Sequence, residues 1–142
     1  ILRLTNVYGP GGNEKGPNKI IKNAVEDKKI EIFGGKQSIN FIYIDDVVNL
    51  ISTIIDKNHI SKEIFNLGSK NNLTVNEFSK LVEQCLDFNI IIKHKPKLNV
   101  ENSIFKPDLK KSEKLLGFTS KTKINDGLKK TINWYVKQKK MK

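Results

Sequence analysis

The chain begins with ILRLTNVYGPGG (residues 1–12), an apolar stretch that breaks into a loop of Gly and Pro. Residues 1–7 have the pattern of a β-strand, and residues 8–16 that of a Gly-rich loop. Pro17 suits the first turn of a helix, which the pattern predicts through residues 19–27. Loops that join strands to helices often carry binding residues, so this junction is the first candidate site.

The remaining sequence alternates between strand and helix patterns. Residues 45 and 46 are both Asp and suit the start of a helix, as does the Thr74–Glu77 capping box. Gly117 is predicted to end one helix, and Asn125 to cap the last. The expected strands are 28–33, 39–44, 63–67 and 89–94, and the expected helices before the last are 47–56, 77–86 and 109–117. This is a mixed α/β pattern and predicts a small mixed sheet packed by helices.

Length and composition are those of one globular unit, residues 1–142, with 37% hydrophobic and 29% charged residues. The apolar runs are too short for a transmembrane helix, and no signal peptide is visible, so we expect a cytoplasmic protein without a membrane partner. The single Cys85 excludes an internal disulfide and a Cys-based zinc site.

The net charge of +11 raises the alternative of a basic nucleic-acid-binding domain or a non-catalytic interaction domain. Arg3 is the only Arg, although Arg is the residue that suits bidentate nucleic-acid contacts. Lys is spread along the whole chain rather than clustered. We therefore expect no dedicated nucleic-acid partner.

The residues alone indicate no catalytic or metal centre. His59 and His94 lack the spacing of a metal pair. The loop glycines at 9, 11, 12 and 16 match neither a dinucleotide-binding loop nor a P-loop. Tyr135 and Lys139 have a Tyr-x-x-x-Lys spacing, but no Ser or Thr partner accompanies them, so Tyr135 is predicted to pack in the core.

Six segments, in order, resemble the extended short-chain dehydrogenase/reductases that act on nucleotide sugars. This is the NAD-dependent epimerase/dehydratase family, with UDP-glucose 4-epimerase and dTDP-glucose 4,6-dehydratase as examples. The segments are RLTNVYGPGG, IFGGKQSINFIYIDDVV, EIFNLGS, TVNEFSKLV, KPDLKKSEKLLGF and INDGLKKTINWY. The resemblance implies the C-terminal, substrate-binding part of a Rossmann-like enzyme. The family's N-terminal glycine loop and catalytic Tyr-x-x-x-Lys have no counterpart in it, so we expect no activity from this part alone.

The resemblance also implies which residues contact ligands. Leu4 and Thr5 match positions whose backbone lies near the nicotinamide of NAD or NADP, a cofactor held mostly by the N-terminal part of the complete enzyme. Lys19 as a solvated side chain, Phe33 as a packing residue and Asp108 as a helix cap remain alternatives. The implied contacts to a UDP- or dTDP-sugar are Asn6, Asn18, Lys19, Ile20, Ile32, Phe33, Lys106 and Asp108. The complete enzyme is expected to be a homodimer.

One position departs from the family pattern. Where the family often has an R-D-F triplet whose Arg contacts the diphosphate, this chain has Ile39-Asn40-Phe41. Lys36 or Lys106 is a candidate for the missing cation. The sugar, the base, and the choice between epimerisation, dehydration and reduction are left open by the sequence.

Overall fold

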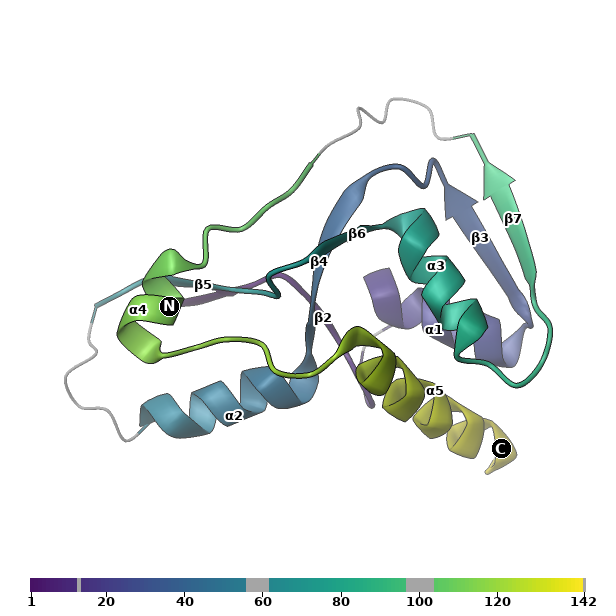
Figure 1. The fold of residues 1–142 in the computed structure, drawn as a ribbon. Coiled ribbons are helices and arrows are strands. Elements are labelled where there is room, and N and C mark those ends of the chain that lie inside the picture. Colours follow the sequence, from purple (N-terminus) through teal and green to yellow (C-terminus); the bar gives the residue numbers. More distant parts are fainter. Residues whose placement is uncertain (13, 56–61, 97–103, 142) are drawn as a thin grey trace.

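The computed structural model describes residues 1–12, 14–55, 62–96 and 104–141, which form a mixed α/β fold (Figure 1). This confirms the predicted fold class. The strands are β1 (Leu2–Leu4), β2 (Asn6–Tyr8), β3 (Lys29–Phe33), β4 (Ser38–Tyr43), β5 (Phe65–Leu67), β6 (Asn72–Thr74) and β7 (Ile91–Lys95). The helices are α1 (Gly16–Glu26), α2 (Ile44–Ile55), α3 (Val75–Gln84), α4 (Lys110–Leu116) and α5 (Ile124–Lys140).

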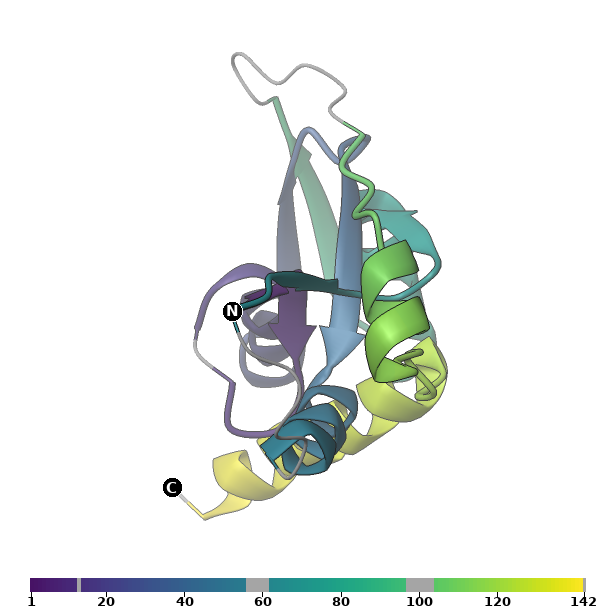
Figure 2. The same ribbon diagram turned by 90° about the vertical axis from the view of Figure 1, so that its left-hand side faces the viewer.

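The strands form three small sheets. The central one has the order β2–β4–β6, with β2 parallel and β6 antiparallel to β4. On one side lie the parallel pair β3–β7 and helices α1, α3 and α5 (Figure 1). On the other side lie the parallel pair β1–β5 and helices α2 and α4, the side that faces the viewer in Figure 2.

The predicted strand 1–7 is divided at Thr5. Its first half, β1, pairs with β5, whereas its second half, β2, pairs with β4. Thr5 N still donates to the carbonyl oxygen of Leu67 at 2.9 Å, so the break lies where the strand leaves one partner for the other. The prediction of one continuous strand was wrong, because its two halves form their backbone hydrogen bonds in different sheets.

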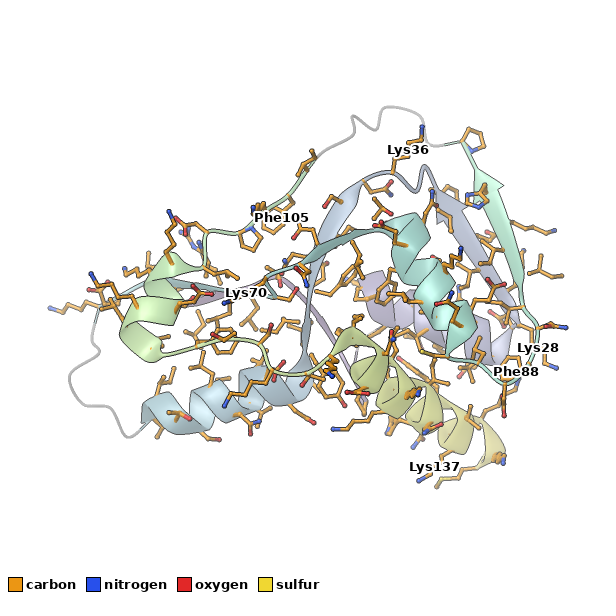
Figure 3. The ribbon with its side chains drawn as sticks, viewed as in Figure 1. Lys28, Lys36, Lys70, Phe88, Phe105 and Lys137 are labelled. Atoms are coloured by element: carbon orange, nitrogen blue, oxygen red, sulfur yellow. The ribbon has the colours of Figure 1, made fainter. Side chains whose placement is uncertain are left out.

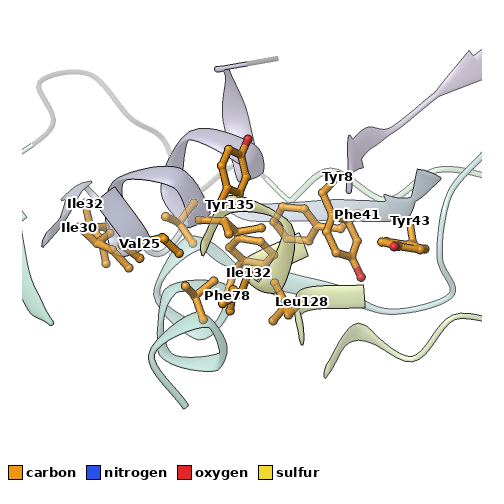
Figure 4. Close-up of a cluster of buried hydrophobic side chains, with 14 residues drawn as sticks. Tyr8, Val25, Ile30, Ile32, Phe41, Tyr43, Phe78, Leu128, Ile132 and Tyr135 are labelled. Carbon is orange, nitrogen blue, oxygen red and sulfur yellow. The ribbon is translucent and has the colours of Figure 1, made fainter. Parts of the chain in front are cut away.

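Within the described residues, the core consists of two hydrophobic clusters. The larger one contains the stacked rings of Phe41 and Phe78, 4.4 Å between centroids, and the ring of Tyr8 edge-on to Phe78 at 6.3 Å (Figure 4). Tyr135 belongs to this cluster and is 4% exposed, which confirms its predicted packing role. The smaller cluster joins α2 and α4 to the β1–β5 pair, and its buried members are Ile42, Val47, Leu50, Phe65, Leu67, Leu116 and Phe118.

Local capping signals were mostly predicted correctly. Thr74 Oγ1 accepts from Glu77 N at 3.1 Å while Thr74 N donates to Glu77 Oε2 at 2.7 Å, the predicted capping box. Gly117, with φ of +66°, ends α4 as predicted. Asn125 is not a cap. The Lys123 carbonyl already accepts from the backbone N–H of residues 126 and 127, so α5 begins earlier and Asn125 lies in its first turn.

Asp45 and Asp46 both lie in the first turn of α2, where negative side chains suit the helix dipole. Asp46, 8% exposed, turns its carboxylate to the chain before α5, where it accepts from Lys121 N at 3.3 Å and Thr122 N at 3.2 Å. Strand β6 was not predicted, and His59 lies outside the described residues. None of the helices in the described ranges is long and apolar enough to cross a bilayer.

Candidate functional site

A pocket of about 270 Å³ lies between the start of α1 and strand β3. Three of the residues predicted from the resemblance, Lys19, Ile20 and Phe33, line it together. Helix α1 places Lys19 and Ile20 one turn after Gly16, whose φ of +52° turns the loop into the helix. The complete lining is Gly16, Lys19, Ile20, Asn23, Ile30, Glu31 and Phe33.

Strand alternation decides what β3 presents to this pocket. Ile32 is 2% exposed and packs in the larger core cluster, so it supports the strand from within. Phe33 is 48% exposed and leaves much of its ring open. Of the two neighbouring residues predicted on this strand, Phe33 is therefore the one available for stacking against a ligand.

Glu31 lines the same pocket and was not predicted from the sequence. Its carboxylate accepts hydrogen bonds from Lys29, with 2.6 Å between Nζ and Oε1, and from Lys95, with 3.0 Å between Nζ and Oε2. These two ammonium groups lower the pKa of Glu31 to about 2. Lys95 Nζ also lies 5.6 Å from the ring centroid of Phe33, a cation–π distance.

Asn6, on β2, borders this pocket at Gly16. A Cβ added to Gly16 would lie 3.7 Å from Asn6 Oδ1, so the amide oxygen faces the start of α1. Asn6 Nδ2 donates to the carbonyl oxygen of Asn40 at 3.1 Å, which fixes the orientation of the amide. The exposed side chain of Asn6 therefore lies beside Gly16, a lining residue of the Lys19–Phe33 pocket, but is not itself part of the lining.

Asn18 occupies a different position from the other predicted contacts. It is 3% exposed, and its Oδ1 accepts from Gly9 N at 3.2 Å while its Nδ2 donates to the Val7 carbonyl at 3.3 Å. Both groups of the amide therefore tie α1 to the loop after β2. Asn18 lines a separate pocket of about 200 Å³ against that loop.

Lys106 and Asp108 are exposed and lie in the segment before α4, away from the lining of the Lys19–Phe33 pocket. Asp108 Oδ1 accepts from Lys110 N, the first residue of α4, at 3.0 Å, although the N-cap residue of this helix is Leu109 rather than Asp108. Its carbonyl oxygen accepts from Asn66 Nδ2 on β5 at 3.2 Å. The structure thus anchors this segment to the β1–β5 sheet.

Leu4 and Thr5 lie where β1 ends. Leu4 is 44% exposed. Thr5 Oγ1 is buried, and in the described residues it has no hydrogen-bond partner. Gly68, at the end of β5, approaches so closely that an added Cβ would lie 2.9 Å from Thr5 Cγ2. A buried hydroxyl oxygen, at Thr5, and an exposed apolar side chain, at Leu4, therefore follow each other at the carboxyl end of β1, beside the end of β5.

The position of the missing family Arg is apolar in structure as well as in sequence. Ile39 pairs with Leu73 across β4 and β6, and both pack against the larger core cluster. Lys36 lies in the exposed turn between β3 and β4 (Figure 3). The other labelled lysines, Lys28, Lys70 and Lys137, come from three further parts of the fold.

Another cavity, of about 350 Å³, contains none of the predicted site residues. It lies between the loop after β5 and the segment before α5, and Tyr8, Asp46 and Lys70 are among its lining. Burial raises the pKa of Tyr8. In the described ranges, no three His, Cys, Asp or Glu side chains gather as a metal site would require.

Comparison with known proteins gives a consistent result. Residues 1–68 match the model of the NAD dependent epimerase/dehydratase family. UDP-glucuronate 4-epimerase of Thermodesulfobacterium geofontis is 32% identical over 137 residues, which cover 94% of this chain and 42% of that protein.

Solved structures agree with the sequence match. UDP-glucose 4-epimerase of Thermotoga maritima, with UDP-glucose, has a TM-score of 0.80 and 27% identity, over 99% of this chain and 46% of the other. UDP-glucuronic acid 4-epimerase from Bacillus cereus, in complex with UDP-glucuronic acid and NAD, has a TM-score of 0.84 and 25% identity, over 97% and 45%. This chain therefore spans less than half the length of these relatives.

Proposed function

We propose that this chain, which matches the NAD dependent epimerase/dehydratase family over residues 1–68, is a part of such an enzyme and binds and orients a nucleoside diphosphate sugar. The observation that carries the proposal is the pocket shared by Lys19, Ile20 and Phe33. A nucleotide sugar offers a flat base, a dianionic diphosphate and a polar sugar. The pocket offers an open ring, an apolar wall and an ammonium group near a helix N-terminus, which suit the first two of these.

Each predicted contact takes a role that agrees with its position. Phe33 stacks on the base, and Ile20 forms the apolar side of the slot. Lys19 pairs with the diphosphate, and Asn6, beside Gly16, forms a hydrogen bond with the part of the ligand that extends out of the pocket. Ile32 and Asn18 act indirectly, by holding β3 and α1 in place, because both side chains are buried and in contact with the rest of the fold.

Lys106 and Asp108 lie outside the pocket lining, so they require a ligand that extends beyond the pocket. Both are exposed on the segment that crosses to α4, so they contact the nucleotide only where it extends out of the Lys19–Phe33 pocket. With Ile39 in place of the family Arg, Lys106 and Lys36 are the proposed sources of the second positive charge. We rank Lys106 and Asp108 below Lys19 and Phe33 as ligand contacts, since neither lines the pocket.

The cofactor of the complete enzyme is proposed to be NAD, which is bound in the Bacillus cereus relative. The residues present fit part of it: the partnerless Thr5 Oγ1 and the exposed Leu4 provide a polar atom and an apolar contact at the end of β1. When bound, NAD supplies a hydride acceptor and donor. This chain contributes the orientation of the sugar toward that end of β1.

The chemistry itself is proposed to need the remainder of the family fold. Strand β1 pairs with β5 on one edge, and within the described ranges no strand covers its other edge. Helix α2 leaves Val48, Ile51 and Ile55 exposed by 50, 39 and 71% along one stripe. An open strand edge and an apolar stripe are the surfaces that a cofactor-binding half would cover.

Calorimetric titration of the 142-residue chain with UDP-glucose tests the proposal. We expect saturable binding that weakens about tenfold in Lys19→Met and in Phe33→Ala, the scale of one charged or stacking contact. Lys114→Met on α4 and Phe105→Ala before it are matched controls outside the pocket, and their affinity should equal that of the wild type. A folded chain that shows no saturable heat would contradict the proposal, and so would controls that weaken as much as the pocket variants.

A further inference from the structure

The Lys19–Phe33 pocket contains the carboxylate of Glu31, which is not used to cap a helix or to satisfy the backbone in the part of the chain that the structure describes. Within the described residues, the Glu31 carboxylate accepts no hydrogen bond from the backbone, and its partners there are the ammonium groups of Lys29 and Lys95. Each carboxylate oxygen accepts one of these bonds and keeps a second lone pair. Glu31 is therefore still an acceptor toward a ligand in the pocket.

This acceptor stays ionised over the range in which proteins function. Lys29 and Lys95 hold its pKa at about 2, so it carries no proton to donate. A group that only accepts selects ligands that present an N–H or O–H to it. Carbonyl and phosphate oxygens are repelled at the same place.

The surroundings of Glu31 indicate what kind of donor fits. Phe33, two residues along the same face of β3, offers a half-open ring for a flat ligand. Lys95 Nζ lies 3.0 Å from Glu31 Oε2 and 5.6 Å from the ring centroid of Phe33, so one ammonium donor is near both the carboxylate and the ring. A flat ligand with an N–H next to a C=O matches this acceptor and this donor.

We propose that Glu31 is a specificity-determining residue of this pocket, whose carboxylate accepts the imino N–H of a uracil-type base stacked on Phe33. Lys95 donates to the carbonyl oxygen beside that N–H. This inference rests on the proposed function, because it assigns the base of the same nucleotide. It adds two residues, Glu31 and Lys95, that the sequence comparison did not indicate.

The test compares UDP with N3-methyl-UDP, in which the imino hydrogen is replaced. Titrated into the wild-type chain, N3-methyl-UDP is expected to bind at least tenfold more weakly than UDP, the effect of a lost hydrogen bond to a charged acceptor. In Glu31→Ala, UDP binding falls about tenfold and the two ligands bind within about twofold of each other. Glu63→Ala is the matched control, since Glu63 loses a similar ion pair, to Lys111 at 2.6 Å, outside the pocket. Glu63→Ala should still bind UDP at least tenfold more tightly than N3-methyl-UDP.

The outcomes separate this inference from the function on which it rests. If UDP binds but Glu31→Ala still discriminates tenfold against N3-methyl-UDP, the role of Glu31 is overturned and the nucleotide site stands. If UDP and N3-methyl-UDP bind the wild-type chain with equal affinity, the role of Glu31 is likewise overturned while the nucleotide site stands. If the folded wild-type chain binds neither UDP nor UDP-glucose, the proposed function and this inference both fail.

Discussion

Asp46 and Thr122 lie 76 residues apart and form two of the three hydrogen bonds by which the Asp46 carboxylate joins α2 to the segment before α5. Thr122 N donates to Asp46 Oδ2 at 3.2 Å, and Thr122 Oγ1 donates to Asp46 Oδ1 at 3.1 Å. Lys121 N donates to the same Oδ1 at 3.3 Å. A buried carboxylate thus satisfies two backbone N–H groups of a loop that would otherwise leave them unpaired.

Substitution of Asp46 by Asn is expected to lower the free energy of unfolding by about 2 kcal/mol. The amide removes the charge and places an NH₂ group against a backbone donor that it cannot satisfy. Urea denaturation measures the change. Asp45→Asn is the control, because the side chain of Asp45 is 55% exposed and its contact to Lys130 is 3.5 Å long. Equal stability of the two variants would contradict the role given to Asp46.

Asn40 organises the turn after β5 from a buried position. It is fully buried; its Oδ1 accepts from Ser69 N at 3.0 Å, and its Nδ2 donates to Ser69 O at 2.8 Å and to Asn72 Oδ1 at 2.7 Å. Asn40→Ala leaves several buried polar groups unpaired and should cost about 3 kcal/mol. Thermal and urea unfolding measure this. Asn133→Ala, on the surface of α5, should change stability by less than about 0.5 kcal/mol, and an Asn40 variant as stable as this control would refute the prediction.

Phe78 holds the larger core cluster together. It is fully buried and contacts both Phe41 and Tyr8 through its ring. Phe78→Ala is expected to cost about 3 to 5 kcal/mol, because it removes a large side chain and leaves a cavity. Phe105→Ala removes the same group from a site that is 54% exposed and should cost less than about 1 kcal/mol. Comparable urea midpoints for the two variants would show that the core is not centred on Phe78.

The features that sequence reasoning predicted correctly depend on near neighbours. The Thr74–Glu77 capping box, Pro17 at the start of α1 and the left-handed Gly117 each involve residues within one turn. The features that it missed depend on distant partners. The break at Thr5 arises from pairing with two different strands, and the three-residue β6 exists only because β4 lies beside it.

The same distinction applies to the candidate site. Lys19, Ile20 and Phe33 were predicted from motif positions, and the fold brings them to one pocket. Asn18 matched a motif as well, but its amide is used between α1 and the loop after β2, which no local pattern reveals. Glu31 was missed because its environment is set by Lys95, 64 residues away on β7. Alternation along β3 was the available signal, since it places residue 31 on the face of Phe33.

The ion pairs of Glu31 predict how its carboxyl group titrates. The folded-state pKa of about 2 lies below the ordinary value of 4.5, so between these values the unfolded chain binds more protons at this site. The contribution of Glu31 to stability is therefore complete above about pH 4.5 and is lost as the pH falls toward 2. Side-chain NMR should show the Glu31 carboxyl titrating near pH 2 in the wild type, and near its ordinary value in a Lys29→Met, Lys95→Met double variant. Because the group is partly exposed, 1 M salt should also raise its pKa. A wild-type Glu31 that titrates near its ordinary value of 4.5 would contradict the ion-pair geometry.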